Sequence, residues 1–140
     1  MNETFHYNLA VIHSGFYRKV FARMLKECPE LTPGQPKVID YLMYNNRARQ
    51  KEIALAYSIE PPTLTNILSR MELRGLVERK KDEKNRRAVI VCLTKRGFDY
   101  GIIIQRILRE VEQEVLTAFS LEEAKRLFDY FQKIKNSLSQ

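Results

Sequence analysis

The chain has 140 residues, of which 44% are hydrophobic and 29% are charged, a composition typical of a folded globular protein rather than a disordered one. This length accommodates one domain, or a small head fused to helices that pair with a second copy, and it excludes two large domains. The formal net charge of +7 favours a polyanionic partner such as a nucleic acid, because Lys and Arg that neutralise phosphates release condensed counterions.

Neither a membrane span nor an export signal is visible in the sequence. No apolar run reaches the roughly 18 residues that a membrane span requires. The first residues lack the basic and apolar segments of a secretory signal. We therefore expect a cytoplasmic protein with no membrane partner. Its two cysteines, Cys28 and Cys92, do not resemble a disulfide framework in a chain of this length.

A first long helix is predicted between Phe5 and Leu25. Apolar residues recur there at steps of three and four, which places them on one helix face. The helix is predicted to end near Cys28-Pro29, because a proline cannot continue the hydrogen-bond ladder.

A second helix is predicted to begin at Pro33 and to end before the polar run 45–50. Thr32 offers an N-cap hydroxyl, Pro33 suits the first helical position, and Gln35 stands three residues after the cap.

A helix-turn-helix with a wing is predicted next. Residues 50–57 read as a short helix with Ile53, Ala54 and Tyr57 inward, and residues 58–62 form a tight connection. The longer helix that follows should end at Gly75, since glycine accepts a left-handed conformation. Two extended runs, 76–80 and 88–93, flank a charged stretch and predict a β-hairpin. A hairpin directly after two such helices indicates a winged helix-turn-helix.

The longer helix has a polar face suited to the major groove. At 100° per residue, its apolar residues share one arc: Leu64, Ile67, Leu68 and Met71. The remaining surface presents Pro62, Thr63, Thr65, Asn66, Ser69 and Arg70. Hydroxyl, amide and guanidinium groups can hydrogen-bond to base edges. The alternative is an ordinary solvated helix face, which the basic hairpin beside it makes less attractive.

The hairpin carries much of the positive charge. Its basic residues are Arg79, Lys80, Lys81, Lys84, Arg86 and Arg87, against two acidic ones, Asp82 and Glu83. An arginine at such a tip can enter the minor groove, where narrow A·T-rich stretches have an enhanced negative potential. The alternative is a loop that only improves solubility.

Two more helices complete the chain. Residues 94–97 are predicted to cap a long helix, and Ser120 to Glu123 form a capping box for the last one. The long helix is expected to turn these residues toward a partner: Phe98, Ile102, Leu108, Val111 and Val115. The last helix carries one apolar stripe, made of Leu121, Ala124, Leu127, Phe128, Phe131, Ile134 and Leu138.

Three stretches in this order resemble the MarR family of bacterial regulators. LTPGQPKVIDYL is similar to the family's second helix, KEIALAYSIEPPTLTNILSRMELRGLVER to its helix-turn-helix and strand entry, and NRRAVIVCLTKRG to its outgoing wing strand and turn. The resemblance implies a mainly α fold with a small β wing. It also implies a triangular homodimer whose two heads face adjacent grooves of double-stranded DNA.

The resemblance divides the chain into three parts: an N-terminal dimerisation helix (1–32), a winged helix-turn-helix DNA-binding domain (33–97) and C-terminal dimerisation helices (98–140). Wide apolar stripes on the terminal helices agree with dimerisation through Phe5, Phe98, Leu127, Phe128 and Phe131 or their neighbours. Two-fold symmetry predicts a palindromic operator with half-sites roughly 34 Å apart. The family mostly represses, so we expect a repressor.

Family roles carry over residue by residue. Thr63, Thr65, Asn66 and Arg70 would face the major groove, Arg86 or Arg87 the minor groove, and Gln50 and Lys51 the phosphates. The sequence departs from the family pattern at four positions: Ser58 for a turn glycine, Glu60 for a serine-like N-cap, Asn66 for an arginine, and Asn85 for the aspartate that orients the wing arginines. These departures affect the expected target and the rigidity of the wing more than the fold.

The family often responds to small aromatic acids, oxidants or metals. An aromatic ligand would lie near His13, Phe16, Tyr17 and Tyr41, although the same residues suit an ordinary core or interface. Cys28, near Lys26, is the candidate for redox sensing if its pKa is lowered, whereas Cys92 suits strand packing. The two histidines give no zinc spacing.

An enzyme is the rival class, but no phosphate loop, metalloprotease motif or catalytic triad is present. We expect no catalysis and no cofactor. A winged helix that binds protein rather than DNA remains the third alternative, because fold does not fix function.

Overall fold

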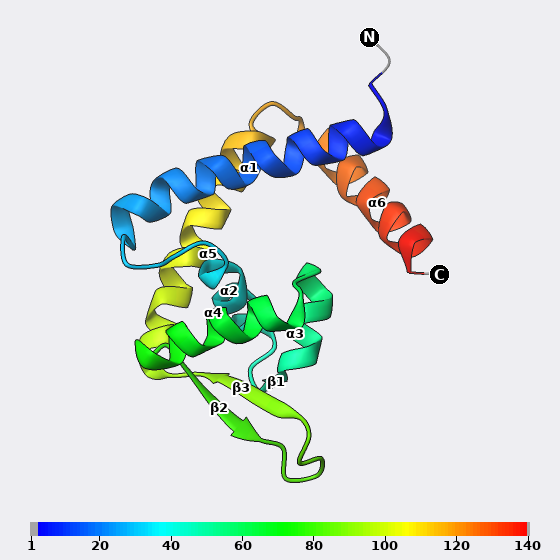
Figure 1. The fold of residues 1–140 in the computed structure, drawn as a ribbon. Coiled ribbons are helices and arrows are strands. Elements are labelled where there is room, and N and C mark those ends of the chain that lie inside the picture. The colour runs from blue at the N-terminus through cyan, green and yellow to red at the C-terminus, as the bar shows by residue number, and fades with distance from the viewer. Residues whose placement is uncertain (1–2, 140) are drawn as a thin grey trace. The chain divides into compact units, whose positions relative to one another are not determined.

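A computed structural model describes residues 3–139 of the chain. Within them the elements in chain order are α1 (Phe5–Glu27), α2 (Gln35–Tyr44), β1 (Ala48–Arg49), α3 (Gln50–Tyr57), α4 (Pro61–Leu73), β2 (Val77–Lys81), β3 (Val89–Leu93), α5 (Lys95–Leu116) and α6 (Leu121–Leu138). Figure 1 shows them along the chain. The predicted fold class, mainly α with a small β wing, is confirmed.

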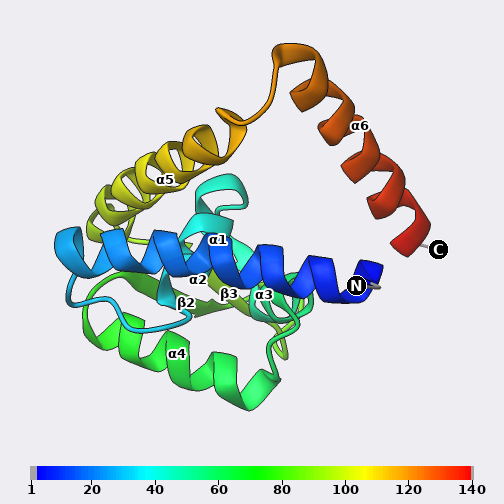
Figure 2. The ribbon, with the colours of Figure 1, turned by 90° about the horizontal axis from the view of Figure 1, so that it is seen from above.

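The chain divides into two compact units, and the division falls inside α5, between Ile107 and Leu108. The first unit contains the helix-turn-helix, the hairpin and the 23-residue α1, which is one unbroken helix (Figure 2). The core of this unit includes these fully buried side chains: Val38, Ile39, Leu42, Ile53, Leu64, Leu68, Met71 and Val91. These residues come from α2, α3, α4 and β3, so one shared core fixes the helix-turn-helix against the sheet.

The sheet has three antiparallel strands in the order β1-β3-β2. The predicted hairpin is present, with Val77 paired to Leu93 and Lys81 to Val89. The additional strand β1 pairs Ala48 with Val91. It was not predicted, because two residues are too few to show the alternation by which strands are recognised.

The start of α2 corrects the prediction. The helix begins at Gln35 rather than at Pro33, and its N-cap is Gly34 in the left-handed region at φ 90°. That backbone conformation suits glycine and lies outside a right-handed helix, so residues 32–34 form a turn. The Thr32 N–H still donates to Oε1 of Gln35 at 3.2 Å, which is half of the expected capping box.

The junction between β3 and α5 is closely packed around Gly97. The Thr94 hydroxyl accepts a hydrogen bond from the Gly97 N–H at 3.0 Å and donates one to the Gly75 carbonyl at 2.5 Å. A Cβ on Gly97 would overlap the Leu76 carbonyl oxygen. Glycine is therefore required where the end of the wing, the end of α4 and the start of α5 meet.

The second unit contains the end of α5 and α6, joined by a turn at residues 117–120 (Figure 2). The capping box of α6 is present, since the Ser120 N–H donates to Glu123 and the Glu123 N–H donates to Ser120. Large apolar side chains of α6 are exposed, among them Phe128 and Phe131, whose rings meet edge to face. No helix described in this structure is long and apolar enough to cross a bilayer.

The expected partner-facing surface of α5 is only partly exposed. Phe98, Ile102 and Val115 are open to solvent, which agrees with the prediction. Val111 is fully buried within the single chain, so it does not face a partner. The assignment of Val111 to a partner-facing surface was wrong because an apolar stripe does not show which neighbour covers each of its residues.

Candidate nucleic-acid interface

The two helices of the helix-turn-helix are joined by residues 58–60. Ser58 ends α3 in the left-handed region at φ 51°, the conformation that the glycine expected from related sequences adopts without cost. Glu60 is the N-cap of α4 and makes no side-chain cap hydrogen bond, while Pro61 begins the helix. Both unusual residues are thus accommodated by the backbone of the turn.

The outer face of α4 has the polar character that was predicted. Leu64, Leu68 and Met71 are fully buried, and Ile67 is half-buried. The exposed residues are Pro62, Thr63, Thr65, Asn66 and Arg70, and Ser69 is half-buried. The apolar arc therefore packs on the core, and the hydrogen-bonding side chains remain on the surface.

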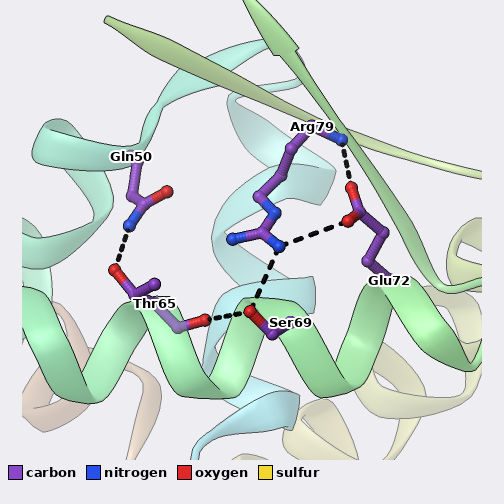
Figure 3. Close-up of polar contacts among 5 residues, drawn as sticks. All are labelled: Gln50, Thr65, Ser69, Glu72 and Arg79. Carbon is purple, nitrogen blue, oxygen red and sulfur yellow. Dashed lines mark hydrogen bonds and ion pairs between the residues drawn. The ribbon is translucent and has the colours of Figure 1, made fainter.

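A chain of hydrogen bonds runs along this face (Figure 3). The Gln50 side-chain amide at the start of α3 donates to the Thr65 hydroxyl at 2.8 Å, which itself donates to the Pro61 carbonyl at 2.9 Å. One turn further on, the Ser69 hydroxyl donates to the Thr65 carbonyl at 2.9 Å. Gln50, expected to contact phosphate, is therefore joined to α4, and the rotamers of Thr65 and Ser69 are restrained.

Arg79 on β2 completes this network and was not predicted as a site residue. Its guanidinium donates to the Ser69 hydroxyl at 3.1 Å and forms an ion pair with Glu72 at 3.2 Å. Its backbone N–H donates to the same carboxylate at 3.0 Å. The hydrogen bond from Arg79 lowers the pKa of Glu72. Arg79 therefore fastens the first wing strand to the C-terminal half of α4.

The tip of the wing has a different construction. The side-chain oxygen of Asn85 accepts a hydrogen bond from the Arg87 backbone N–H at 3.2 Å. Asp82 accepts one from the Lys84 N–H at 3.0 Å and pairs with Arg49 at 3.2 Å. Asn85 thus organises the turn backbone, while an aspartate three residues earlier anchors the wing to the start of α3. The side chains of Lys84, Arg86 and Arg87 are exposed.

A groove of about 830 Å³ lies between α3 and the outgoing wing strand. Its lining includes the predicted phosphate contacts Gln50 and Lys51 together with Arg87 from the wing and Arg49. Its apolar lining includes Leu55 and Val89. The fold therefore places basic groups from β1, α3 and the tip of the wing around one concave surface beside α4.

The four aromatic residues expected to bind a ligand fall into two groups. On α1, the rings of His13 and Phe16 lie 4.7 and 5.5 Å from the ring of Tyr17. Tyr41 on α2 instead packs edge to face against Tyr57, with ring centroids 5.9 Å apart. Tyr57 was assigned to the core by the sequence pattern, and nothing in that pattern indicated its contact with Tyr41.

Cys28 does not have the environment of a redox sensor. It is 1% exposed, and burial together with the nearby Glu30 and Glu27 raises the pKa of its thiol, more than Arg106 lowers it. A sensing thiol needs a lowered pKa and solvent access. The redox alternative suggested by the sequence therefore has no structural support. Cys92 is half-buried in β3, as its place in a strand suggested.

One sequence signal could have found Arg79. Alternate residues of a strand share a face, so Arg79 lies on the same face as Val77, which is buried. A charged residue on the inner face of a strand needs a partner. Glu72, seven residues earlier, is the acidic residue that the preceding helix offers as this partner.

Comparison with known proteins gives one consistent result. Residues 31–89 match the family model described as the MarR family. The chain is 25% identical over 134 residues to the HTH-type transcriptional regulator BilQ of Clostridium symbiosum, covering 96% of this chain and 92% of BilQ.

Solved structures share the fold. The S. aureus MepR–DNA complex superposes with a TM-score of 0.77 at 26% identity, covering 96% of this chain and 98% of that one. A putative MarR family transcriptional regulator from Listeria monocytogenes, complexed with a 26mer DNA, superposes with a TM-score of 0.86 at 19% identity, covering 99% and 90%.

Proposed function

We propose that this protein, a transcriptional regulator of the MarR family, binds a palindromic operator in double-stranded DNA as a homodimer and represses transcription. In this proposal residues 33–97 read the DNA, and residues 1–32 and 98–140 form the dimer. The protein acts in the cytoplasm, and a small-molecule ligand releases it from the operator.

The polar face of α4 beside a basic wing is the observation that carries the proposal. Thr63, Thr65, Asn66 and Arg70 are exposed on one helix of major-groove size, and their groups match base edges. Arg86 and Arg87 extend from the wing, where an arginine can enter the minor groove. The similar MepR and Listeria proteins were crystallised with DNA, which supports the same partner here.

Dimerisation is supported by exposed aromatic side chains on the terminal helices. Phe5 of α1, Phe98 of α5 and Phe128 of α6 are each about half exposed. Water contact with side chains of this size is unfavourable, and a second copy would cover them. Sedimentation or light scattering should give a molecular mass of twice the 16.5 kDa of one chain.

The central test is titration of the purified protein against duplex DNA from its own upstream region, beside a random duplex of equal length. A regulator of this gene should prefer the upstream duplex, and its affinity should fall steeply with salt because phosphate contacts release counterions. Equal affinity for both duplexes at every salt concentration would contradict an autoregulated operator. Salt-independent binding would favour a protein partner instead.

A further inference from the structure

Asp40 lies close to three tyrosines in the first compact unit. Tyr17 comes from α1, Tyr41 from α2 and Tyr57 from α3. The rings of Tyr41 and Tyr57 meet edge to face at 5.9 Å. Asp40 and all three tyrosines are half-buried, so each keeps some contact with solvent.

The Asp40 carboxylate lacks a donor that its position demands. Its Oδ1 atom is buried and accepts no hydrogen bond. In the described part of the chain, one other buried side-chain nitrogen or oxygen lacks a hydrogen-bond partner, namely Gln35 Nε2. A buried carboxylate oxygen is unfavourable unless a hydrogen-bond donor or a cation compensates it.

Two of the phenols respond to the charge of this carboxylate. Burial raises the pKa of Tyr17, and the charge of Asp40 raises it further. Burial raises the pKa of Asp40. Burial, followed by the charge of Asp40 and the neighbouring Tyr17 and Tyr41, raises the pKa of Tyr57 to about 12. The cluster therefore combines aromatic rings with one carboxylate whose buried Oδ1 has no donor within the described part of the chain.

One ring of the cluster already binds a cation within the chain. The Lys37 ammonium lies over the face of Tyr17, 4.6 Å from its centroid. This geometry uses the negative face of the ring. Lys37 lies one helical turn before Asp40, yet the buried Oδ1 remains without a donor. The Lys37 ammonium is thus engaged by Tyr17, while the nearby Asp40 oxygen has no donor.

We propose that Asp40, Tyr17, Tyr41 and Tyr57 form a binding site for an organic ammonium ligand. An N–H of the ligand donates to Asp40 Oδ1, and its hydrocarbon part packs against the tyrosine rings. A primary or secondary amine fits best, because the missing group is a hydrogen-bond donor rather than a charge alone. Asp40 repels the carboxylate of an aromatic acid, the effector class expected from the sequence, so the ligand class differs from that expectation.

The test uses three probes of similar size and the wild-type full chain. Isothermal titration with phenethylamine, its N,N,N-trimethyl derivative and 3-phenylpropanoate compares a donor cation, a cation without N–H groups and an anion. We expect phenethylamine to bind at least tenfold more tightly than either of the others. Equal affinity of the primary and trimethylated amines, or tighter binding of the acid, would overturn the proposal.

Asp40→Asn supplies the matching variant. It keeps the size of the side chain and removes the charge, so phenethylamine affinity should fall at least tenfold. Asp129→Asn, an exposed carboxylate on α6, should leave the affinity unchanged. Circular dichroism checks that both variants fold, and unaltered amine binding by folded Asp40→Asn would contradict the proposed site. This inference deepens the effector part of the proposed function, but the titrations contain no DNA, so the two can fail separately.

Discussion

The recognition helix α4 and the tip of the wing both present polar groups, but the two regions hold them differently. On α4, Thr65 and Ser69 are restrained by hydrogen bonds to Gln50 and Arg79. At the tip, Asn85 fixes the backbone of the turn, and the Arg86 and Arg87 side chains extend into solvent. A restrained face suits selection among base edges, whereas exposed cations suit attraction to phosphate and to a narrow groove. Specificity and electrostatic affinity should therefore be separable by mutation.

The largest effect should come from breaking the junction on which both regions depend. In Gly97→Ala, the new methyl group overlaps the Leu76 carbonyl and presses on Leu93. A decrease of at least about 2 kcal/mol in unfolding free energy is expected, since neither backbone nor core can yield freely. Chemical denaturation measures it. Gly15→Ala is the control, because a Cβ there meets open space within the chain. Equal stability of the two variants would contradict the packing argument.

The wing is tested by the double variant Arg86→Ala/Arg87→Ala. We expect affinity to fall about tenfold or more on every duplex, and the slope of log K against log salt to decrease by about 0.9 for each phosphate that the wing no longer neutralises. Binding titrations at several salt concentrations measure both. The control is Lys125→Ala/Lys133→Ala, which lowers the net charge equally but changes residues of α6. A similar decrease in DNA affinity for this control would assign the effect to overall charge.

The recognition helix is tested by Asn66→Ala. An amide can bond two atoms of an adenine edge, so its removal should cost about 1–3 kcal/mol on the preferred operator. Affinity for a random duplex should stay the same, which is the opposite of the pattern expected for the wing. Asn136→Ala on α6 serves as the control. Equal weakening on both duplexes would place Asn66 among the phosphate-binding residues instead.

The smallest effect concerns the ion pair that fastens the wing strand to α4. The pKa of Glu72 is lowered in the folded state. The ion pair therefore stabilises the fold fully at pH values above the ordinary glutamate pKa. This contribution is lost as the pH falls through the lowered, folded-state pKa. Glu72→Gln should cost at most about 1 kcal/mol at pH 7, because the pair is partly exposed.

Urea unfolding of wild type and Glu72→Gln between pH 7 and pH 3 measures this difference, which should shrink toward the acid end. Glu78→Gln is matched, because Glu78 and Lys80 form a long and exposed pair at 3.9 Å. A difference that stays constant with pH would show that the carboxylate charge is not the cause.

Local pattern predicted most of the fold. The bounds 50–57 of α3 and the hairpin were predicted correctly, because helical and alternating periods of apolar residues are visible in the sequence without any knowledge of tertiary contacts. The start of α2 was misplaced by two residues, because the left-handed Gly34 interrupts a sequence that otherwise resembles a capped helix. The strand β1 was missed because it exists only through its pairing with β3.

Residue spacing alone determines the winged helix-turn-helix. It sets the order of two helices and a basic hairpin, and it places one apolar arc on the longer helix. Which polar groups meet is a property of the folded chain. Arg79 joins Glu72 and Ser69, Cys28 is closed to solvent, and Asp40 on α2 lies near Tyr17 of α1 and Tyr57 of α3. These outcomes depend on contacts between residues distant along the chain, and a local period carries no information about such contacts.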